Sequence, residues 1–467
     1  MTAKPLAQAK FLVFEGIIGL LSGLLMILLI SRVRGEGFLG QYVVFSTWTA
    51  LFQPLATLGI PDLILRETGK HPDDGGVFMN CGLLLSGISS SLAAIIMFVV
   101  VRLLHYPAEV ETALELASLT LVPAAIAALS KSGFVARSQL RIYLLISLPE
   151  MLIILLFNTH FIVNDHQISS LVKTILFTRT ASSLLLLYVL NRAVIPIDRR
   201  LHPHVLRGLF RPLFSFSMSS LSVFAFWRID IIMLSKMTSI STAGIYVTAS
   251  KFLEVLSVFP ASFSQTMFPH LSRQFAVGAA DRLDLERAIR NLFQLVVPIS
   301  VAAFLFAGPI IRTIFGARFT PAVPVLRICM VTLIILASDM VMASICQAAG
   351  YQRAHVYVSL INITINILLN FILIPIASIV GAGLATLISI SVSAILHYRF
   401  VSRNVIVLNW GAILLKPLVT GLVLALPVVL LEEKVHFVLL GIAYAVAYGL
   451  VFVLYASAEK THRPERS

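Results

Sequence analysis

The stretch FLVFEGIIGLLSGLLMILLISRV, from Phe11 to Val33, decides which class of protein this chain encodes. Its only charged side chains are Glu15 and Arg32. A helix needs about 20 mostly apolar residues to cross the hydrocarbon core of a bilayer. A secretory signal peptide has a shorter apolar core followed by a small-residue cleavage site, and this stretch fits neither feature. We therefore expect a membrane-spanning helix at residues 11–33.

The composition of the whole chain excludes an ordinary soluble protein. Of its 467 residues, 58% are hydrophobic and 12% are charged, and the mean hydropathy is +0.95. Soluble domains are about half apolar and about a quarter charged. The net charge of +13 (35 basic minus 22 acidic residues) fits basic cytoplasmic loops better than nucleic-acid binding. The three cysteines lie in apolar stretches and no metal-ligand spacing occurs, so we expect no disulfide, metal or cofactor.

The same length test predicts an all-α, polytopic membrane protein with about fourteen spanning helices. The predicted spans are 11–33, 40–65, 77–101, 112–130, 142–162, 168–190, 212–235, 243–267, 291–311, 323–347, 354–374, 378–398, 411–431 and 435–456. Lysine and arginine concentrate in alternate connections, with 22 on the side of the N-terminus, Lys131 among them, and 7 on the other. Because cytoplasmic loops carry this excess, we expect both termini in the cytoplasm.

An internal repeat relates the two halves of the chain. The segment ILLISRVRGEGFLGQYVV (Ile27–Val44) aligns with IIMLSKMTSISTAGIYVT (Ile231–Thr248) at a constant offset of 204 residues. Six predicted helices separate the copies, so both insert in the same orientation, as in transporters built from parallel repeats. The repeat predicts an N-terminal lobe at 1–190, a basic cytoplasmic linker at 191–211, a C-terminal lobe at 212–400 and two additional helices with a tail at 401–467.

Ionisable side chains inside the spans are the candidate functional residues, because charge at membrane depth is costly unless it faces protein or water. The set that we consider comprises Glu15, Glu150, Lys173, Arg179, Arg228, Asp230, Lys251, Glu254, Arg327 and Asp339. Arg228 and Asp230 are two residues apart and point to different sides of a helix, so neither satisfies the other. Lys251 and Glu254 are three apart and can neutralise each other, which competes with a binding role for Lys251.

We assign substrate binding to the basic members Arg179, Arg228, Lys251 and Arg327 because of their depth in the membrane and their pairing. The guanidinium group of the arginines can bind phosphate through its planar fork. The alternative for each is an interhelical salt bridge. Coupling to protons or sodium would use the acidic members Glu15, Asp230 and Asp339. Asn362 and Asn366 form, with Asn370, an amide stripe at four-residue spacing. This stripe could bind sugar hydroxyls, and helix–helix hydrogen bonding is the competing interpretation.

Two segments carry a resemblance to a known family. GEGFLGQYVVFSTWTALFQPLATLGIPDLILRE (Gly35–Glu67) is similar to the second-helix region of polysaccharide transporters, the O-antigen and lipid-linked oligosaccharide flippases of the multidrug/oligosaccharidyl-lipid/polysaccharide superfamily. The segment from Arg228 to Arg273 resembles the seventh and eighth helices of that family, with Asp230, then Gly244-x-Tyr246, then Phe268-Pro269. The family has no position-specific substrate motif, so the candidate residues above rest on depth and pairing.

The resemblance implies a fold of two six-helix lobes around a central cavity, here with two more helices. It implies a flippase that moves an undecaprenyl-diphosphate-linked oligosaccharide, such as an O-antigen unit of lipopolysaccharide, from the cytoplasmic to the periplasmic leaflet by alternating access. The expected location is the bacterial inner membrane. Membrane lipid, a polysaccharide polymerase and chain-length machinery are the expected partners.

Three other functions remain open at this point. A multidrug or lipid II exporter of the same superfamily would share the fold. A membrane polysaccharide polymerase or ligase is less consistent with the short predicted outer loops, so we expect no enzyme. A scaffold within a glycan assembly would tolerate substitutions of the candidate residues.

Overall fold

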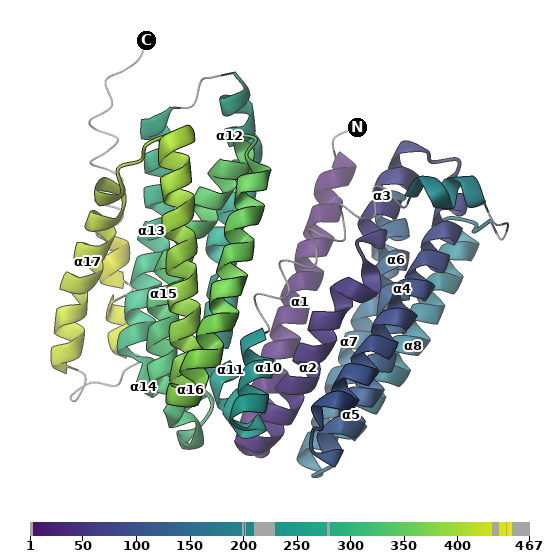
Figure 1. The fold of residues 1–467 in the computed structure, drawn as a ribbon, viewed down its shortest axis with the longest axis horizontal. Helices are drawn as coiled ribbons and strands as arrows, with labels where there is room; N and C mark the ends of the chain where they lie inside the picture. The colour runs from purple at the N-terminus through teal and green to yellow at the C-terminus, as the bar shows by residue number, and fades with distance from the viewer. Residues whose placement is uncertain are drawn as a thin grey trace. The chain divides into compact units, whose positions relative to one another are not determined.

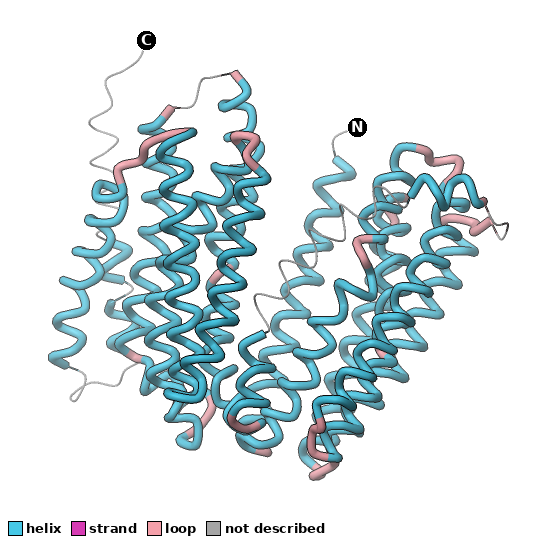
Figure 2. Tube along the Cα trace, viewed as in Figure 1, coloured by secondary structure: helices cyan, strands magenta, loops and turns pink. Residues whose placement is uncertain are grey.

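The computed structural model describes residues 3–198, 200, 202–209, 229–277, 281–431, 439–444 and 446–450. Within these ranges every regular element is a helix (Figure 2). In the described part of the chain, eleven helices are long and apolar enough to cross a membrane, which confirms the predicted all-α, polytopic fold. The predicted spans 212–235 and 435–456 lie partly outside the described ranges, so the total of fourteen stays a prediction.

The chain forms two compact units, Met1–Gly244 and Ile245–Ser467. Unit 1 contains α1 (Ala3–Val33), α2 (Gly35–Thr57), α3 (Ile60–Lys70), α4 (Gly75–Leu104), α5 (Ala108–Leu119), α6 (Leu121–Ala136), α7 (Leu140–Val163), α8 (Ile168–Ala193) and α10 (Ile229–Met237). Helix α11 (Ile240–Leu256) begins in unit 1 and continues into unit 2. Unit 2 then contains α12 (Val258–Ala276), α13 (Arg282–Leu305), α14 (Ala307–Ile314), the 3-10 helix η1 (Ala317–Ala322), α15 (Val323–Ala348), α16 (Gln352–Asn404) and α17 (Trp410–Leu431).

Helix α6 is the centre of unit 1, where it packs against α3, α4 and α8 (Figure 1). Small residues make this approach possible, because lipid-embedded helices associate through close backbone packing. At Gly133, for example, an added Cβ would meet the Leu190 side chain at 2.9 Å. Leu129 and Phe134 are fully buried in the same apolar cluster as Leu190.

Helix α15 has the corresponding position in unit 2. It packs against α12, α13 and α16, as α6 packs against α3, α4 and α8. The repeated segments also share local geometry: Ser31 Oγ donates to Leu28 O and Ser235 Oγ donates to Ile232 O, both at 2.8 Å. These likenesses support the repeat inferred from the sequence. The proposed lobe boundaries at residues 190, 212 and 400 stay a prediction.

Helix α16 contains two antiparallel halves rather than one long rod. Its backbone leaves helical geometry at Ser378 (φ 50°, ψ −125°). Beyond this point the chain folds back, so that Asn366 hydrogen-bonds Ser389 although 23 residues separate them. The halves correspond to the predicted spans 354–374 and 378–398. A Cβ at Gly381 would overlap Leu373 O, so glycine permits the tight reversal.

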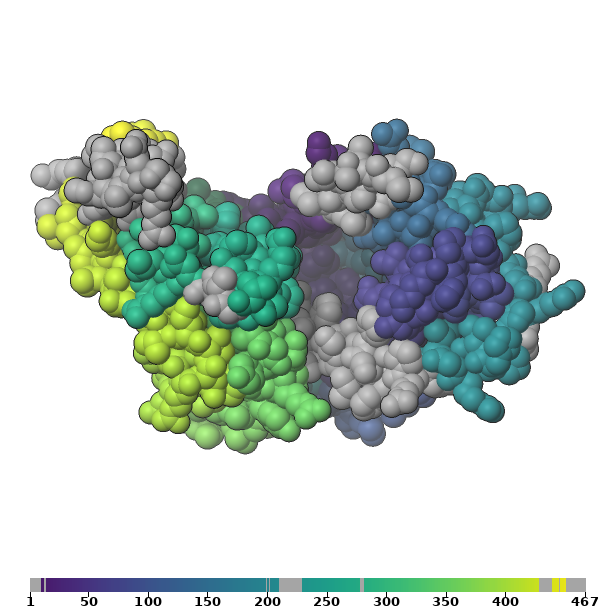
Figure 3. Space-filling view, turned by 90° about the horizontal axis from the view of Figure 1, so that it is seen from above, coloured from purple at the N-terminus to yellow at the C-terminus, as the bar shows by residue number. Residues whose placement is uncertain are grey.

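The connection after α8 is anchored to the α3–α4 end of unit 1. The backbone N–H of Asp198 donates to Gly76 O at 3.3 Å, and Asn80 Nδ2 donates to Arg200 O at 2.8 Å. Figure 3 shows this end, where the teal atoms near residue 200 lie beside the blue-violet atoms of the α3–α4 region. Arg66, Lys70 and Arg207 lie in the same two segments, which agrees with the basic connections predicted here.

Candidate functional site

The first buried polar cluster of unit 1 joins α1, α6 and α7. Glu15 is 8% exposed. Its Oε2 forms an ion pair with Lys131 Nζ at 2.7 Å, and its Oε1 accepts a hydrogen bond from the Tyr143 hydroxyl at 2.9 Å. The predicted need of Glu15 for a partner on another helix is confirmed. The predicted end of the span 112–130, which placed Lys131 in the following loop, is wrong, because α6 continues to Ala136.

A second polar cluster lies between α7 and α8. Glu150 Oε1 pairs with Arg179 Nε at 3.4 Å, and Glu150 Oε2 accepts a hydrogen bond from Ser182 Oγ at 2.6 Å. The Glu150 side chain is 12% exposed, whereas that of Arg179 is 35% exposed. Arg179 is therefore in the interhelical salt bridge that the sequence left open as an alternative. Its guanidinium group keeps donors that face away from Glu150.

The two clusters share one face of α7. Tyr143, Ser147 and Glu150 are spaced by four and three residues, which places them in line along the helix. Lys131 and Arg179 are each about one-third exposed, with side-chain values of 33% and 35%, whereas the side chains of their partners Glu15 and Glu150 are 10% and 12% exposed. An anionic ligand could approach the exposed side of both cations without removing the two acids from their hydrogen bonds.

Of the charged pair Arg228 and Asp230, the structure describes only Asp230. Arg228 lies outside the described residues. Asp230 lies in the first turn of α10, is half-buried, and accepts a hydrogen bond from the backbone N–H of Ile231 at 2.8 Å. Lys251 and Glu254 form the ion pair that their spacing allowed, with Nζ and Oε1 at 2.9 Å.

Arg327 of α15 contrasts with the paired cations. Its guanidinium carbon lies 5.7 Å from the centroid of the Phe304 ring, and the side chain is exposed. Among the described residues, no carboxylate forms a salt bridge with it. A cation–π contact of this kind leaves the hydrogen-bond donors of arginine available to other groups.

The asparagine stripe lies between the two halves of α16. Asn366 Nδ2 donates to Ser389 Oγ at 3.2 Å, and Asn370 Nδ2 donates to Asn366 Oδ1 at 3.0 Å. All three asparagines are buried. Asn366 is therefore in the helix–helix hydrogen bonding that competed with sugar binding. Asn362 Oδ1 has no hydrogen-bond donor within the described part of the chain.

Asp339 is in a cluster that the sequence predicted only in part. His397 Nδ1 lies 2.7 Å from Asp339 Oδ1, and His397 Nε2 lies 3.2 Å from His355 Nδ1. No histidine was among the site residues predicted from the sequence, although His397 falls inside the predicted span 378–398. A histidine within an apolar span was the signal that could have identified this cluster. In the described ranges, no group of three or more His, Cys, Asp or Glu is arranged to hold a metal ion.

Tyr106 connects α10 to the rest of unit 1 at the opposite end from the basic loops. Its hydroxyl contacts Trp48 Nε1 at 3.2 Å and Ser235 Oγ at 3.1 Å. The Lys236 ammonium lies 3.3 Å from the centre of the Tyr106 ring and also donates to Leu104 O. Burial raises the pKa of Tyr106, so the phenol stays neutral. These contacts hold α10 against α2 and the connection between α4 and α5 at this end.

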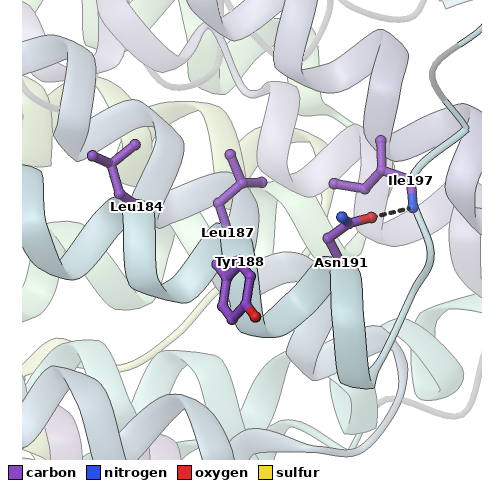
Figure 4. Close-up of a pocket in the computed structure, with 5 residues that line it drawn as sticks. All are labelled: Leu184, Leu187, Tyr188, Asn191 and Ile197. Carbon is purple, nitrogen blue, oxygen red and sulfur yellow. Dashed lines mark hydrogen bonds between the residues drawn. The ribbon is translucent and has the colours of Figure 1, made fainter.

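A shallow hollow of about 280 Å³ lies on α8, lined by Leu184, Leu187, Tyr188, Asn191 and Ile197 (Figure 4). Its lining is mostly apolar, and Asn191 Oδ1 accepts a hydrogen bond from the backbone N–H of Ile197 at 2.8 Å (Figure 4). None of the predicted site residues lines it. The hollow therefore contributes no charged group to the candidate site.

Curated relatives are similar to part of this chain. The probable low-salt glycan biosynthesis flippase Agl15 of Haloferax volcanii is 26% identical over 201 residues, which is 42% of this chain and 43% of that protein. The probable flippase AglR of the same organism is 28% identical over 185 residues, 38% of each chain. The capsular polysaccharide biosynthesis protein CapF of Staphylococcus aureus is 27% identical over 166 residues, 35% of this chain and 41% of that protein. The chain therefore spans less than half the length of these relatives.

Solved structures share the fold across nearly the whole chain. The lipid II flippase MurJ in an inward closed conformation superposes with a TM-score of 0.76 at 14% identity, covering 96% of this chain and 99% of that one. An inward-facing MATE-family multidrug resistance transporter of the MOP superfamily has a TM-score of 0.65 at 16% identity, covering 82% and 93%. The family model described as polysaccharide biosynthesis protein matches residues 25–324. Because that match covers more than half of the chain, the protein belongs to the polysaccharide biosynthesis protein family.

Proposed function

We propose that this protein is a flippase that moves a lipid-linked oligosaccharide across the membrane by alternating access. Membership of the polysaccharide biosynthesis protein family is the observation that carries the proposal. Two of the curated relatives, Agl15 and AglR, are named as probable flippases, which favours transport over a polymerase or ligase. The MurJ-like fold supports the same reading. We therefore treat the protein as a transporter, not an enzyme.

The substrate we propose is an undecaprenyl-diphosphate-linked oligosaccharide, such as an O-antigen repeat unit, moved from the cytoplasmic to the periplasmic leaflet. The diphosphate requires cations that can contact it without a large desolvation cost. Arg327 is exposed and Arg179 is about one-third exposed, so both can meet this requirement. Lys251 and Arg228 complete the proposed basic set. Arginine binds phosphate oxygens in a bidentate manner, so the headgroup would engage them while the prenyl chain remains in lipid.

The setting we propose is the bacterial inner membrane, with both termini in the cytoplasm. A polysaccharide polymerase and its chain-length machinery are the proposed partners, since they would consume the translocated unit. Asp230, Glu15 and Asp339 are the proposed coupling residues. Glu15 pairs with the ammonium group of Lys131, whereas Asp339 contacts a histidine.

A second candidate substrate is lipid II or a cationic drug. The observation that favours it is the TM-score of 0.76 to MurJ over 96% of this chain. At 14% identity this likeness concerns the fold alone. The two candidates differ in the sugar or drug carried and not in the architecture.

Reconstitution into liposomes tests the proposal. Fluorescent undecaprenyl-diphosphate-linked oligosaccharide, fluorescent lipid II and ethidium are supplied separately, and exposure of each on the far side is measured with a membrane-impermeant quencher or by accumulation. We expect translocation of the oligosaccharide lipid above protein-free vesicles. Preferential movement of lipid II or ethidium would establish the second candidate, and no movement of any of the three would refute transport.

A further inference from the structure

A chain of three titratable side chains crosses unit 2 from its surface to its interior. His355 lies in the first turn of α16 and is half-buried, whereas His397 is 1% exposed and Asp339 is 9% exposed. His355 Nδ1 and His397 Nε2 are 3.2 Å apart, and His397 Nδ1 lies 2.7 Å from Asp339 Oδ1. The hydroxyl of Ser393 also faces both carboxylate oxygens of Asp339, at 3.0 and 3.1 Å.

The partner of Asp339 distinguishes it from three other acids at membrane depth. Glu15, Glu150 and Glu254 pair with Lys131, Arg179 and Lys251 respectively. Within the described ranges, no lysine or arginine forms a salt bridge with Asp339, and its cation-capable neighbours are imidazoles. An uncompensated carboxylate inside a membrane protein is costly, and an imidazole compensates it only after gaining a proton. The charge balance of this cluster therefore depends on a proton.

When both imidazoles are neutral and Asp339 is ionised, the hydrogen bonds determine which nitrogen of each ring carries the hydrogen. The Asp339 carboxylate can only accept, so His397 carries its hydrogen on Nδ1. His397 Nε2 is then an acceptor, and it accepts from the Nδ1–H of His355. This leaves His355 Nε2, at the half-buried end, as the atom that binds an incoming proton without breaking any of these bonds.

Binding one proton changes the net charge of the cluster from −1 to 0. The proton can remain on His355. Alternatively, His355 passes its Nδ1 proton to His397 Nε2, and His397 passes its Nδ1 proton to Asp339, so that both rings are again neutral. Each transfer occurs along an existing hydrogen bond, and one proton enters while none is lost.

Other ionisable groups on α15, on α16 and on the helices α12 and α13 that pack against α15 have partners of their own or face outward. Cys346 of α15 lies near the backbone N–H of His355. Arg353 and Arg399 of α16 and His270 and Arg273 of α12 are exposed. On α13, Arg282 forms an ion pair with Glu286 and Arg287 forms one with Asp284. The charge of Arg290 also interacts electrostatically with Glu286.

We propose that His355, His397 and Asp339 form a proton-binding site in unit 2 and that its proton drives substrate movement. The proposal that the proton drives substrate movement rests on the proposed function, whereas the proposal of a proton-binding site does not. The half-buried end of the cluster, His355, lies close to the α15–α16 turn, which the predicted topology assigns to the cytoplasmic face. His355 and His397 are thereby given a role beyond the coupling role expected for Asp339 alone.

Proton binding is tested directly by NMR titration of isotope-labelled histidine in nanodiscs. We expect one titrating histidine resonance to disappear in His355→Gln. In Asp339→Asn, the proton affinity that this resonance reports should fall about tenfold or more, since a neighbouring carboxylate shifts such equilibria by about one to three pH units. His270→Gln, at an exposed position of α12, should remove only its own resonance. An identical titration in wild type and Asp339→Asn would overturn the proposal.

Coupling is tested in liposomes with an imposed pH gradient and the fluorescent oligosaccharide lipid. We expect the gradient-dependent part of the rate to fall at least tenfold in Asp339→Asn and in His355→Gln, and to persist in His270→Gln. His355→Gln keeps an amide that can donate to His397, so it guards against loss of folding. Full gradient stimulation in both variants would refute the coupling. If wild type moves no lipid at all, the proposed function fails while the NMR titration still decides the proton site.

Discussion

Gly40 and Gly244, which the internal repeat aligns at an offset of 204, pack against each other. A Cβ on Gly40 would overlap the carbonyl of Ile240, and a Cβ on Gly244 would lie 2.5 Å from the carbonyl of Glu36. Residues 36 and 240 are themselves 204 apart, so the two contacts are equivalent. The starts of α2 and α11 therefore cross at a local two-fold axis through this glycine pair.

Replacing either glycine with a branched residue should push the starts of α2 and α11 apart where they cross. We expect Gly40→Val and Gly244→Val each to destabilise the protein by about 1–3 kcal/mol through overpacking, measured as lowered thermal stability in detergent by size-exclusion chromatography. Gly23→Ala is the control, because its added Cβ would meet nothing within 4 Å. Equal stability of Gly244→Val and Gly23→Ala would contradict the close contact.

Removing Lys131 should leave Glu15 as a buried charge without its cation. Losing one partner of a buried pair costs about 3–5 kcal/mol, and because Lys131 is one-third exposed we expect Lys131→Met to lose about 1–3 kcal/mol. The double variant Glu15→Gln/Lys131→Met should recover part of the loss. Lys70→Met is the control, since Lys70 is exposed and lies 3.7 Å from Glu67. No recovery in the double variant would argue against the ion pair.

Arg179→Ala should reduce transport of the oligosaccharide lipid by about tenfold or more, because a charge-assisted hydrogen bond contributes about 1.5–3 kcal/mol. Arg179→Lys should retain more activity, and Arg312→Ala, at an exposed position of α14, should transport normally. The rate in liposomes at matched protein content measures this. Unchanged transport by Arg179→Ala would remove Arg179 from the substrate site.

Gly381→Val should disrupt the reversal of α16, because the added side chain would overlap Leu373 O. We expect a loss of about 1–3 kcal/mol and reduced yield of folded protein. Gly383→Ala is a matched control two residues along, since its Cβ would make ordinary contacts at 3.5 Å and beyond. A stable Gly381→Val variant would show that the reversal has more room.

The loop after α8 should loosen in acid. The backbone N–H of Arg200, then the His202 side chain, lower the pKa of Asp198 from its usual value of 3.8. A lowered folded-state pKa adds stability above that value, and this stability is lost as the pH falls below about 3.8. We expect hydrogen-exchange protection of the Arg200 amide, corrected for intrinsic rates, to fall between pH 6 and pH 3. Asp198→Asn should show low protection at both, and a pH-independent wild type would contradict the assignment.

The sequence alone determined the class of this protein. Apolar runs as long as Phe11–Val33 have no stable place outside a bilayer, and a bilayer admits the backbone only as hydrogen-bonded helix. The repeat and the Lys251–Glu254 pair could also be predicted, because a constant offset and an i,i+3 spacing are both properties of the sequence itself. These inferences needed no knowledge of which helices touch.

Only the tertiary structure decided the partners of the lone charges. Lys131 is 116 residues from Glu15, and His397 is 58 residues from Asp339. The contact pairs depend on how helices rotate and cross, and their apolar faces constrain that rotation weakly because lipid and protein interior are similarly apolar. Periodicity along one helix therefore showed that Glu15 and Asp339 needed partners, whereas packing between helices selected a lysine for one and a histidine for the other.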